Sequence, residues 1–254
     1  MVIGTKKMGG HMYVGWNMKT NLVTITPETS IFKAREMMDA HKISHLPVTD
    51  GKAHLLGIVT DRNLKEAWAS PATTLSVHEL TYVLQKLTVA NIMTRKVITA
   101  TPNMTIERAA RIIHDNKIGA LPVLKNDRLV GIITTTDLMN VFLMSLGMSD
   151  DTKRFSLLVT DRSRVLAEVG SLMQLSGINI LSVMIVPLHD YRGRQDGHDP
   201  RSERHSQYRQ EVWQLIVRIH VAVYSKAVKA LEEAGFKVIT QYVEDVTPYL
   251  PLRA

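Results

Sequence analysis

The 254-residue sequence contains no cysteine, which excludes disulfide bonds, thiolate metal ligands and cysteine nucleophiles. Aromatic residues account for only 6% of the chain, and no apolar run approaches the roughly 20 residues that a membrane helix requires. Residues 1–12 lack the continuous apolar segment of a signal peptide, so we expect an N-terminal extension, native or added, and no export. Together these absences favour a cytoplasmic protein that does not enter a membrane.

Basic residues outnumber acidic ones, and the formal net charge is +7. The lysines and arginines are scattered, however, and no basic stripe is interleaved with aromatic residues. This pattern argues against nucleic acid as a partner. A positive balance also attracts small anions, nucleotides included.

The strongest positive feature is an internal repeat. Residues 14–48 align with residues 89–123 and, with one residue dropped, residues 57–64 fall on residues 131–138. Two copies of one supersecondary unit can pack face to face and form paired clefts between them. We therefore expect a ligand of this chain to bind in these clefts.

Each repeat, at residues 13–72 and 89–147, reads as strand, helix, strand, strand and helix. Ser30 and Thr105 are suited to cap the first helices, because a hydroxyl can accept a bond from a free backbone N–H. Between the repeats, residues 73–88 carry leucine and valine at helical spacing, which predicts a connecting helix. The first strands are expected at residues 23–26 and 97–101.

A second module follows a polar linker at residues 148–154. Residues 155–246 read as βαββαβ, which predicts a four-stranded antiparallel sheet with two helices on one face, the ferredoxin-like arrangement. The fourth strand is expected at residues 236–243, and residues 247–254 form a C-terminal tail. A polar insertion at residues 189–211 carries histidines and acids, but their spacing matches no compact metal motif, so we expect a solvated loop and no metal.

The repeats resemble a pair of CBS domains, the tandem regulatory unit called a Bateman module. The matching signatures are ISHLPV and GIVTDRN in the first repeat and IGALPV and GIITTTD in the second. The resemblance implies an α+β fold of two βαββα repeats related by a pseudo-two-fold axis. It also implies that an adenosine compound, such as AMP, ADP, ATP or S-adenosylmethionine, binds in the clefts between the repeats.

The residue types of the second repeat suit such a ligand. A carboxylate that accepts from both ribose hydroxyls makes charge-assisted hydrogen bonds, which are roughly twice as strong as neutral ones. Asp137 is placed to do this at the entry of a helix, Thr134 can add a hydroxyl contact, and the alternative is that both only cap the helix. Gly119 and Ala120 leave room for a flat base against the backbone. Apolar walls are expected from Val97, Ile98, Leu121 and Pro122.

The first repeat departs from this pattern, because Asn63 replaces the aspartate and leaves only a neutral amide for the ribose. Thr60 remains, but the lining on the base side is bulkier, so we expect this site to be weaker or changed in specificity. That lining consists of Ile43, Ser44 and His45. Candidates for binding phosphate are His45, Arg62, Lys65 and Arg95.

Residues 155–245 resemble an ACT domain, a module that often binds an amino acid at a turn between two copies. Asp161 and Asn179 match the ligand residues of that family, but Ser163-Arg164 stands in place of its Pro-Gly pair. Glycine lets backbone N–H groups close on a carboxylate, whereas Arg164 brings a long side chain into that space. Arg164 could bind an anion instead, and the alternative is a module that only mediates interactions.

The order of a CBS pair followed by an ACT-like module resembles the bacterial acetoin-utilisation (AcuB) family. This implies a regulatory protein that senses an adenosine nucleotide and is linked to acetoin or related carbon metabolism. We expect no enzyme, because no nucleophile and base converge in the pattern, and we expect a homodimer formed through apolar faces of the modules. The alternatives are an interaction scaffold with empty clefts that docks a metabolic enzyme, and an amino-acid sensor based on the ACT-like module.

Overall fold

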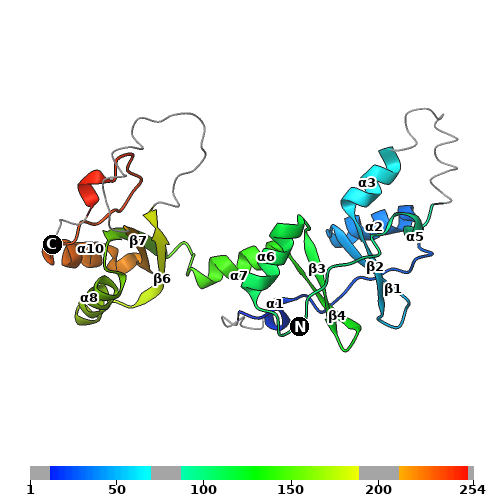
Figure 1. Ribbon diagram of the computed structural model, residues 1–254, viewed down its shortest axis with the longest axis horizontal. Helices are drawn as coiled ribbons and strands as arrows, with labels where there is room; N and C mark the ends of the chain where they lie inside the picture. Colours follow the sequence, from blue (N-terminus) through cyan, green and yellow to red (C-terminus); the bar gives the residue numbers. More distant parts are fainter. Residues whose placement is uncertain (1–11, 70–86, 189–211, 251–254) are drawn as a thin grey trace. The chain divides into compact units, whose positions relative to one another are not determined.

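The computed structural model describes residues 12–69, 87–188 and 212–250 (Figure 1). These form two compact units, Met1–Phe142 and Leu143–Ala254. The N-terminal extension, nearly all of the expected connecting helix, the polar insertion and the last four residues lie outside the described residues.

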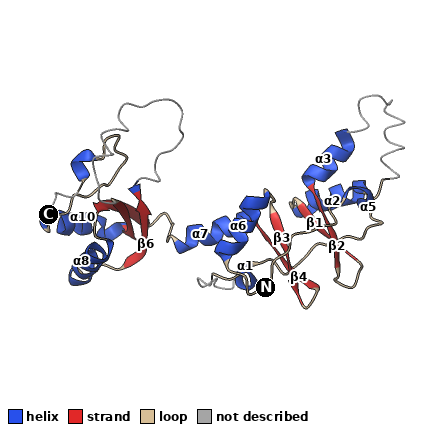
Figure 2. Cartoon of the chain, viewed as in Figure 1, coloured by secondary structure: helices blue, strands red, loops and turns tan. Residues whose placement is uncertain are grey.

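Apart from its leading strand, the first repeat folds as expected, as a helix, a β-hairpin and a second helix (Figure 2). Ser30 caps the first helix, because its Oγ accepts a hydrogen bond from the backbone N–H of Lys33 at 3.2 Å. The apolar face of this helix is buried against the hairpin. The elements are α2 (Ile31–His41), β1 (His45–Thr49), β2 (Leu55–Thr60) and α3 (Asp61–Ala69).

The second repeat has the same order of elements. Thr105 caps its first helix through Arg108, whose backbone N–H donates to Thr105 Oγ1 at 3.3 Å. In the two antiparallel hairpins, His45 lies opposite Thr60 and Ala120 lies opposite Thr134, so the matching residues of the repeats hold matching positions. The elements are α6 (Ile106–Asn116), β3 (Ala120–Lys125), β4 (Arg128–Thr134) and α7 (Thr135–Ser145).

The leading strands expected at residues 23–26 and 97–101 are each reduced to a single parallel bridge, Ile25 with Val48 and Ala100 with Val123. Proline explains why. Extending each bridge backwards would need a backbone N–H from Pro47 or Pro122, and proline has none. In the other direction each chain reaches Pro27 or Pro102, which cannot donate either. The expected strands were therefore too long.

The leading segment of each repeat packs on the opposite repeat, which the sequence did not reveal. Helix α1 (Val14–Asn17) lies on the second repeat, where the Val14 backbone N–H donates to Met104 O at 2.8 Å (Figure 1). Helix α5 (Val89–Ile92) lies on the first repeat, where the Val89 N–H donates to Thr29 O at 2.8 Å. Both valine side chains are fully buried in the hydrophobic core of the repeat they join. Each core is therefore completed by the other half.

The two leading segments make matching contacts, in agreement with the pseudo-symmetry of the repeats. Lys19 and Ile132 exchange two backbone hydrogen bonds of 2.9 and 3.0 Å, and Thr94 and Ile58 exchange the same pair. The methionine that precedes each bridge, Met18 or Met93, packs on a glycine of the opposite hairpin. A side chain on these glycines would collide with the methionine, so the close approach of the segment requires glycine there.

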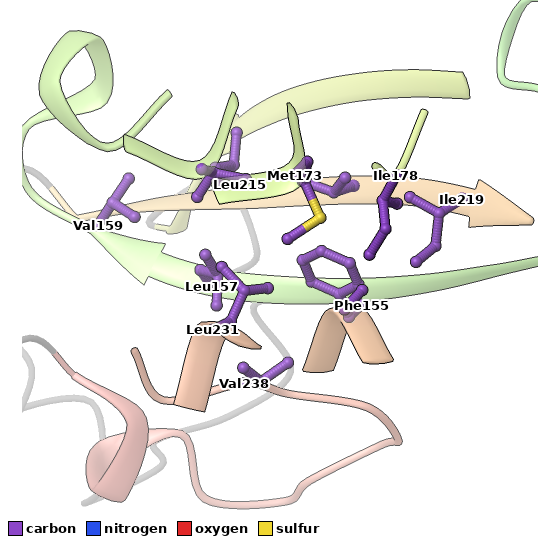
Figure 3. Close-up of a cluster of buried hydrophobic side chains, with 12 residues drawn as sticks. Phe155, Leu157, Val159, Met173, Ile178, Leu215, Ile219, Leu231 and Val238 are labelled. Atoms are coloured by element: carbon purple, nitrogen blue, oxygen red, sulfur yellow. The ribbon is translucent and has the colours of Figure 1, made fainter. Parts of the chain in front are cut away.

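The second unit contains a three-stranded antiparallel sheet in the order β5-β7-β6. Alternate residues of β5 and β7, together with one side of α8 and of α10, form its core, which is shown in Figure 3. Both helices therefore cover the same face, as expected. The elements are β5 (Thr152–Val159), α8 (Arg162–Leu175), β6 (Ile180–Pro187), β7 (Trp213–His220), α10 (Tyr224–Glu233) and the short 3₁₀ helices η2 (Val221–Val223) and η3 (Thr247–Tyr249).

The expected fourth strand of this unit is not formed as a strand. Ile239 makes one antiparallel bridge with Ser156 of β5, with backbone hydrogen bonds of 2.8 and 2.9 Å. The segment lies at the edge of the sheet beside β5, but the neighbouring residues do not continue the ladder. Residues Leu158, Val212 and Ile239 instead form a small separate cluster with the C-terminal segment. Among the described residues, no helix is both long and apolar enough to cross a membrane.

Candidate functional site

The junction of β4 and α7 holds a fixed carboxylate. Asp137 Oδ2 accepts hydrogen bonds from the backbone N–H of Thr134 at 2.9 Å and from Thr134 Oγ1 at 2.6 Å. In return, the Asp137 N–H donates to Thr134 Oγ1 at 3.3 Å. Only 12% of the Asp137 side chain is exposed. The two residues expected to hold the ribose are thus brought together, in a reciprocal cap that fixes the side-chain rotamer.

The second carboxylate oxygen of this junction has a partner that sequence reasoning missed. Lys19 Nζ lies 3.2 Å from Asp137 Oδ1, and the lysine side chain is 59% exposed. Lys19 comes from the leading segment of the first repeat, and its backbone bridge to Ile132 brings it to this corner. The one signal in the sequence is a difference between the two leading segments: Lys19 is charged, whereas the residue at the matching position of the second repeat is the neutral Thr94.

The matching junction of β2 and α3 has the same geometry without the charge. Asn63 Oδ1 accepts from the Thr60 N–H at 3.0 Å and from Thr60 Oγ1 at 2.7 Å, and the Asn63 N–H donates to Thr60 Oγ1 at 3.2 Å. The amide oxygen therefore replaces one carboxylate oxygen in the cap. What is lost is the second acceptor and the negative charge.

The base-side residues of the two repeats meet each other. His45, at the start of β1, lies against Gly119, and the Thr135 backbone N–H donates to Gly119 O at 3.0 Å. Burial lowers the pKa of His45 below its ordinary value, because desolvation penalises the charged imidazolium. The space beside Gly119 that we expected to be open to a base is therefore occupied by a neutral imidazole of the other repeat.

The apolar residues expected as walls divide into two groups. Leu121 is fully buried in the core of the second repeat, and Ala120 and Pro122 are also buried. Side chains alternate along a strand, so Leu121 faces the core together with Val123 and does not form a wall. Val97 is half-buried and Ile98 is 38% exposed, which leaves both accessible.

The comparisons with known proteins agree with this repeat architecture. The CBS domain family matches residues 13–70 and 89–143. A CBS domain-containing protein of Dictyostelium discoideum is 32% identical over 130 residues, which cover 51% of this chain and 90% of that protein. The chain belongs to the CBS-domain proteins. Inosine-5'-monophosphate dehydrogenase of Staphylococcus aureus is 30% identical over 138 residues, but the CBS pair spans only 25% of that enzyme.

Solved CBS structures show similar matches over about half of the chain. CBSX2 in complex with AMP is 28% identical, with 53% of this chain and 98% of that chain covered and a TM-score of 0.45. A CBS domain pair in complex with 5-methylthioadenosine and S-adenosyl-L-methionine is 29% identical, with 51% and 94% covered and a TM-score of 0.44. An acetoin utilization protein (AcuB) from Vibrio cholerae, described as putative, is 28% identical, with 53% and 93% covered and a TM-score of 0.45.

The basic residues considered for phosphate in the CBS pair have partners elsewhere. Arg62 Nε donates to Glu66 at 2.8 Å on the exposed side of α3, and the Arg95 guanidinium donates to Ala90 O at 3.0 Å. Lys65 Nζ lies 2.6 Å from Asp61 and, by its hydrogen bond, is the main cause of the lowered pKa of that carboxyl. None of these three contacts points to a ligand.

In the second unit, the residues compared with an ACT ligand site serve the helix. Asp161 caps α8 by accepting from the Arg164 N–H at 3.0 Å, and Arg164 Nε donates to Glu168 at 2.8 Å. Asn179 is exposed after the helix end. The guanidinium of Arg162 lies 4.0 Å from the ring centroid of Trp213, a contact that the sequence did not suggest. Within the described part of the chain, no three acidic or histidine side chains gather as metal ligands.

Proposed function

We propose that this protein is a cytoplasmic regulator without catalytic activity that binds an adenosine nucleotide between its two CBS repeats. The observation that carries the proposal is the fixed carboxylate of Asp137 at the junction of β4 and α7. A ribose offers two adjacent hydroxyls, and a carboxylate whose rotamer is already set loses little entropy on binding them. Membership of the CBS family and the resemblance to adenosine-binding pairs support adenosine as the ligand class.

The two sites are unequal in this proposal. Asn63 presents a neutral amide, so the first site lacks charge-assisted bonds and binds the same ligand more weakly. The second site takes its ligand first, and the two leading segments transmit the change because each completes the core of the opposite repeat. A ligand that favours one arrangement of the repeats shifts the population towards it.

The C-terminal unit is proposed as the part that passes the state to a partner. Its one-sided sheet and α8–α10 layer support an ACT-like module that mediates interactions, in a homodimer. The capped Asp161 and paired Arg164 favour this use over amino-acid binding. The domain order supports a link to acetoin or related carbon metabolism, and the regulated partner is then a metabolic enzyme.

Titration calorimetry with AMP, ADP, ATP and S-adenosylmethionine tests the proposal. We expect at least one of them to bind, and Asp137→Asn to weaken it by about tenfold or more, the equivalent of one lost charge-assisted hydrogen bond. The variant should fold, because Asn63 makes the same cap in the first repeat. Asp150→Asn removes an exposed carboxylate and is the matched control. Absence of binding by all four compounds would favour the scaffold with empty sites.

A further inference from the structure

Lys19 links the leading segment of one repeat to the binding corner of the other. Its backbone bridge to Ile132 places it beside β4, and its ammonium group neutralises Asp137 at 3.2 Å. At the matching position of the first site the backbone bridge is kept by Thr94, and the corner residue is Asn63. The carboxylate and the ammonium group are thus both present at the second site, and both are replaced by neutral residues at the first.

The acceptor capacity of Asp137 shows what this ion pair does. An ionised carboxylate offers about four lone-pair positions. Oδ2 uses two of them for the N–H and O–H of Thr134, and Oδ1 forms an ion pair with the ammonium group of Lys19 at 3.2 Å. The two positions on Oδ1 remain for a ribose diol, which donates two hydrogen bonds, but the ammonium group stands against this oxygen. Full binding of the diol therefore requires the lysine to leave.

We propose that Lys19 is a specificity residue of the second site, which leaves Asp137 when a ligand binds and pairs with its phosphate. This inference rests on the proposed function. A nucleoside that carries a phosphate gives the displaced ammonium group a new anionic partner, whereas uncharged adenosine leaves it unpaired. S-adenosylmethionine carries a sulfonium and an ammonium group against a single carboxylate, so its net positive charge disfavours pairing with the lysine. The site therefore selects nucleotides over both.

The side chain is suited to this exchange. Lysine carries a compact charge on a flexible four-carbon stem, and the exposed fraction of 59% leaves room for it to turn. The other cations considered for phosphate are held by Glu66, Ala90 O and Asp61. Lys19 is the one that a ribose on Asp137 would itself set free.

The test compares adenosine, AMP and S-adenosylmethionine as calorimetric ligands of the wild type and of Lys19→Thr. Threonine is the residue that the first site carries at this position, so the backbone bridge to Ile132 is expected to persist, and thermal unfolding checks this. Lys33→Thr removes an equally exposed lysine, paired with Glu36 on α2, and is the matched control. The amide NMR signals of Thr134 and Asp137 assign each effect to the second site.

For Lys19→Thr we expect AMP to bind about tenfold more weakly, since one charge-assisted contact is lost. Adenosine should bind as well as before or better, because Oδ1 is now free, and Lys19→Arg should retain the preference for AMP. Equal changes for AMP and adenosine, or no change for either, would overturn the inference while the proposed function stands. A wild type that binds none of the three compounds, nor ADP or ATP, would instead refute the proposed function, and this inference with it.

Discussion

His45 of the first repeat lies against Gly119 of the second, with Nε2 only 2.7 Å from the place where a Cβ atom on the glycine would stand. The imidazole therefore uses the space that glycine leaves, and the two repeats are in contact at their base-side residues. The counterpart of His45 in the second repeat is Ala120, so the contact is not symmetric. This contact is a second difference between the two sites, in addition to the replacement of Asp137 by Asn63.

Gly119→Ala is expected to destabilise the first unit by about 1–3 kcal/mol, because the half-buried ring of His45 must move out of its position to make room for the added methyl group. Urea unfolding measures the change. Gly170→Ala is the matched control: a Cβ atom at Gly170 in α8 meets nothing within 4 Å, so alanine should be neutral or stabilise the helix by about 0.5–1 kcal/mol.

The double variant Gly119→Ala/His45→Ala identifies the cause of that loss. If the ring is the obstacle, alanine at position 45 removes it, and the double variant should be more stable than the sum of the single changes by about 1 kcal/mol or more. Additive effects would mean that Gly119 is required for another reason.

The pH dependence of stability should also report the burial of His45. Because the folded protein lowers the pKa of His45 below 6.5, the unfolded chain binds this proton more tightly. The contribution of the buried His45 side chain to stability is complete above pH 6.5, and it is lost as the pH falls from there through the pKa of the folded state. Urea unfolding at several pH values between about 5 and 8 should show a smaller pH slope in His45→Gln than in the wild type. An unchanged slope would show that the imidazole is not desolvated.

The sequence was sufficient to predict the two helices and the hairpin of each repeat, because their signals are local. Ser30 and Thr105 cap helices whose apolar residues recur at helical spacing, and the hairpins follow from the signatures shared by the repeats. The leading strands were overestimated, because each depends on a ladder that Pro47 or Pro122 cannot complete. The strand at Ile239 was overestimated too, since its pairing with β5 stops after one bridge.

Within one repeat, the sequence indicated the corner formed by Thr134 and Asp137, whereas the wall expected from Leu121 was wrong because this side chain faces the core. Thr134 and Asp137 are three residues apart at a strand-to-helix corner, and their contact follows from that spacing. Lys19 and His45 could not be placed, because each reaches its position through the packing of one repeat on the other. Helical or strand periodicity contains no information about which leading segment completes which core.

The exchanged segments lead to a prediction about local stability. Val14→Ala removes fully buried methyl groups from the core of the second repeat and should cost about 1–3 kcal/mol. Amide hydrogen exchange followed by mass spectrometry should show a larger increase in rate over the wild type in β3 and β4 than in β1 and β2, although Val14 belongs to the first repeat in sequence. Val89→Ala should give the opposite pattern. Faster hydrogen exchange of β1 and β2 in Val14→Ala would contradict the packing of each leading segment on the opposite repeat.

The turn between β1 and β2 contains a carboxyl with a strongly shifted pKa. Asp50 Oδ2 lies 2.7 Å from His54 Nδ1, and Oδ1 accepts from the backbone N–H groups of Lys52 and His54. These bonds, above all the one from His54, lower the pKa of Asp50 from 3.8 to about 2. The ionised Asp50 carboxylate therefore stabilises the turn fully above pH 3.8, and this contribution disappears as the pH falls through about 2.

NMR titration of the Asp50 carboxyl carbon should give a midpoint near 2 in the wild type. In His54→Ala the midpoint should rise towards 3.8 without reaching it, because the two backbone N–H groups still donate to Oδ1. His114→Ala removes another exposed histidine that is paired with an aspartate, Asp115, and should leave Asp50 unchanged. A midpoint of 3.8 in the wild type would mean that the carboxylate is hydrated in solution and that the imidazole does not hold the turn.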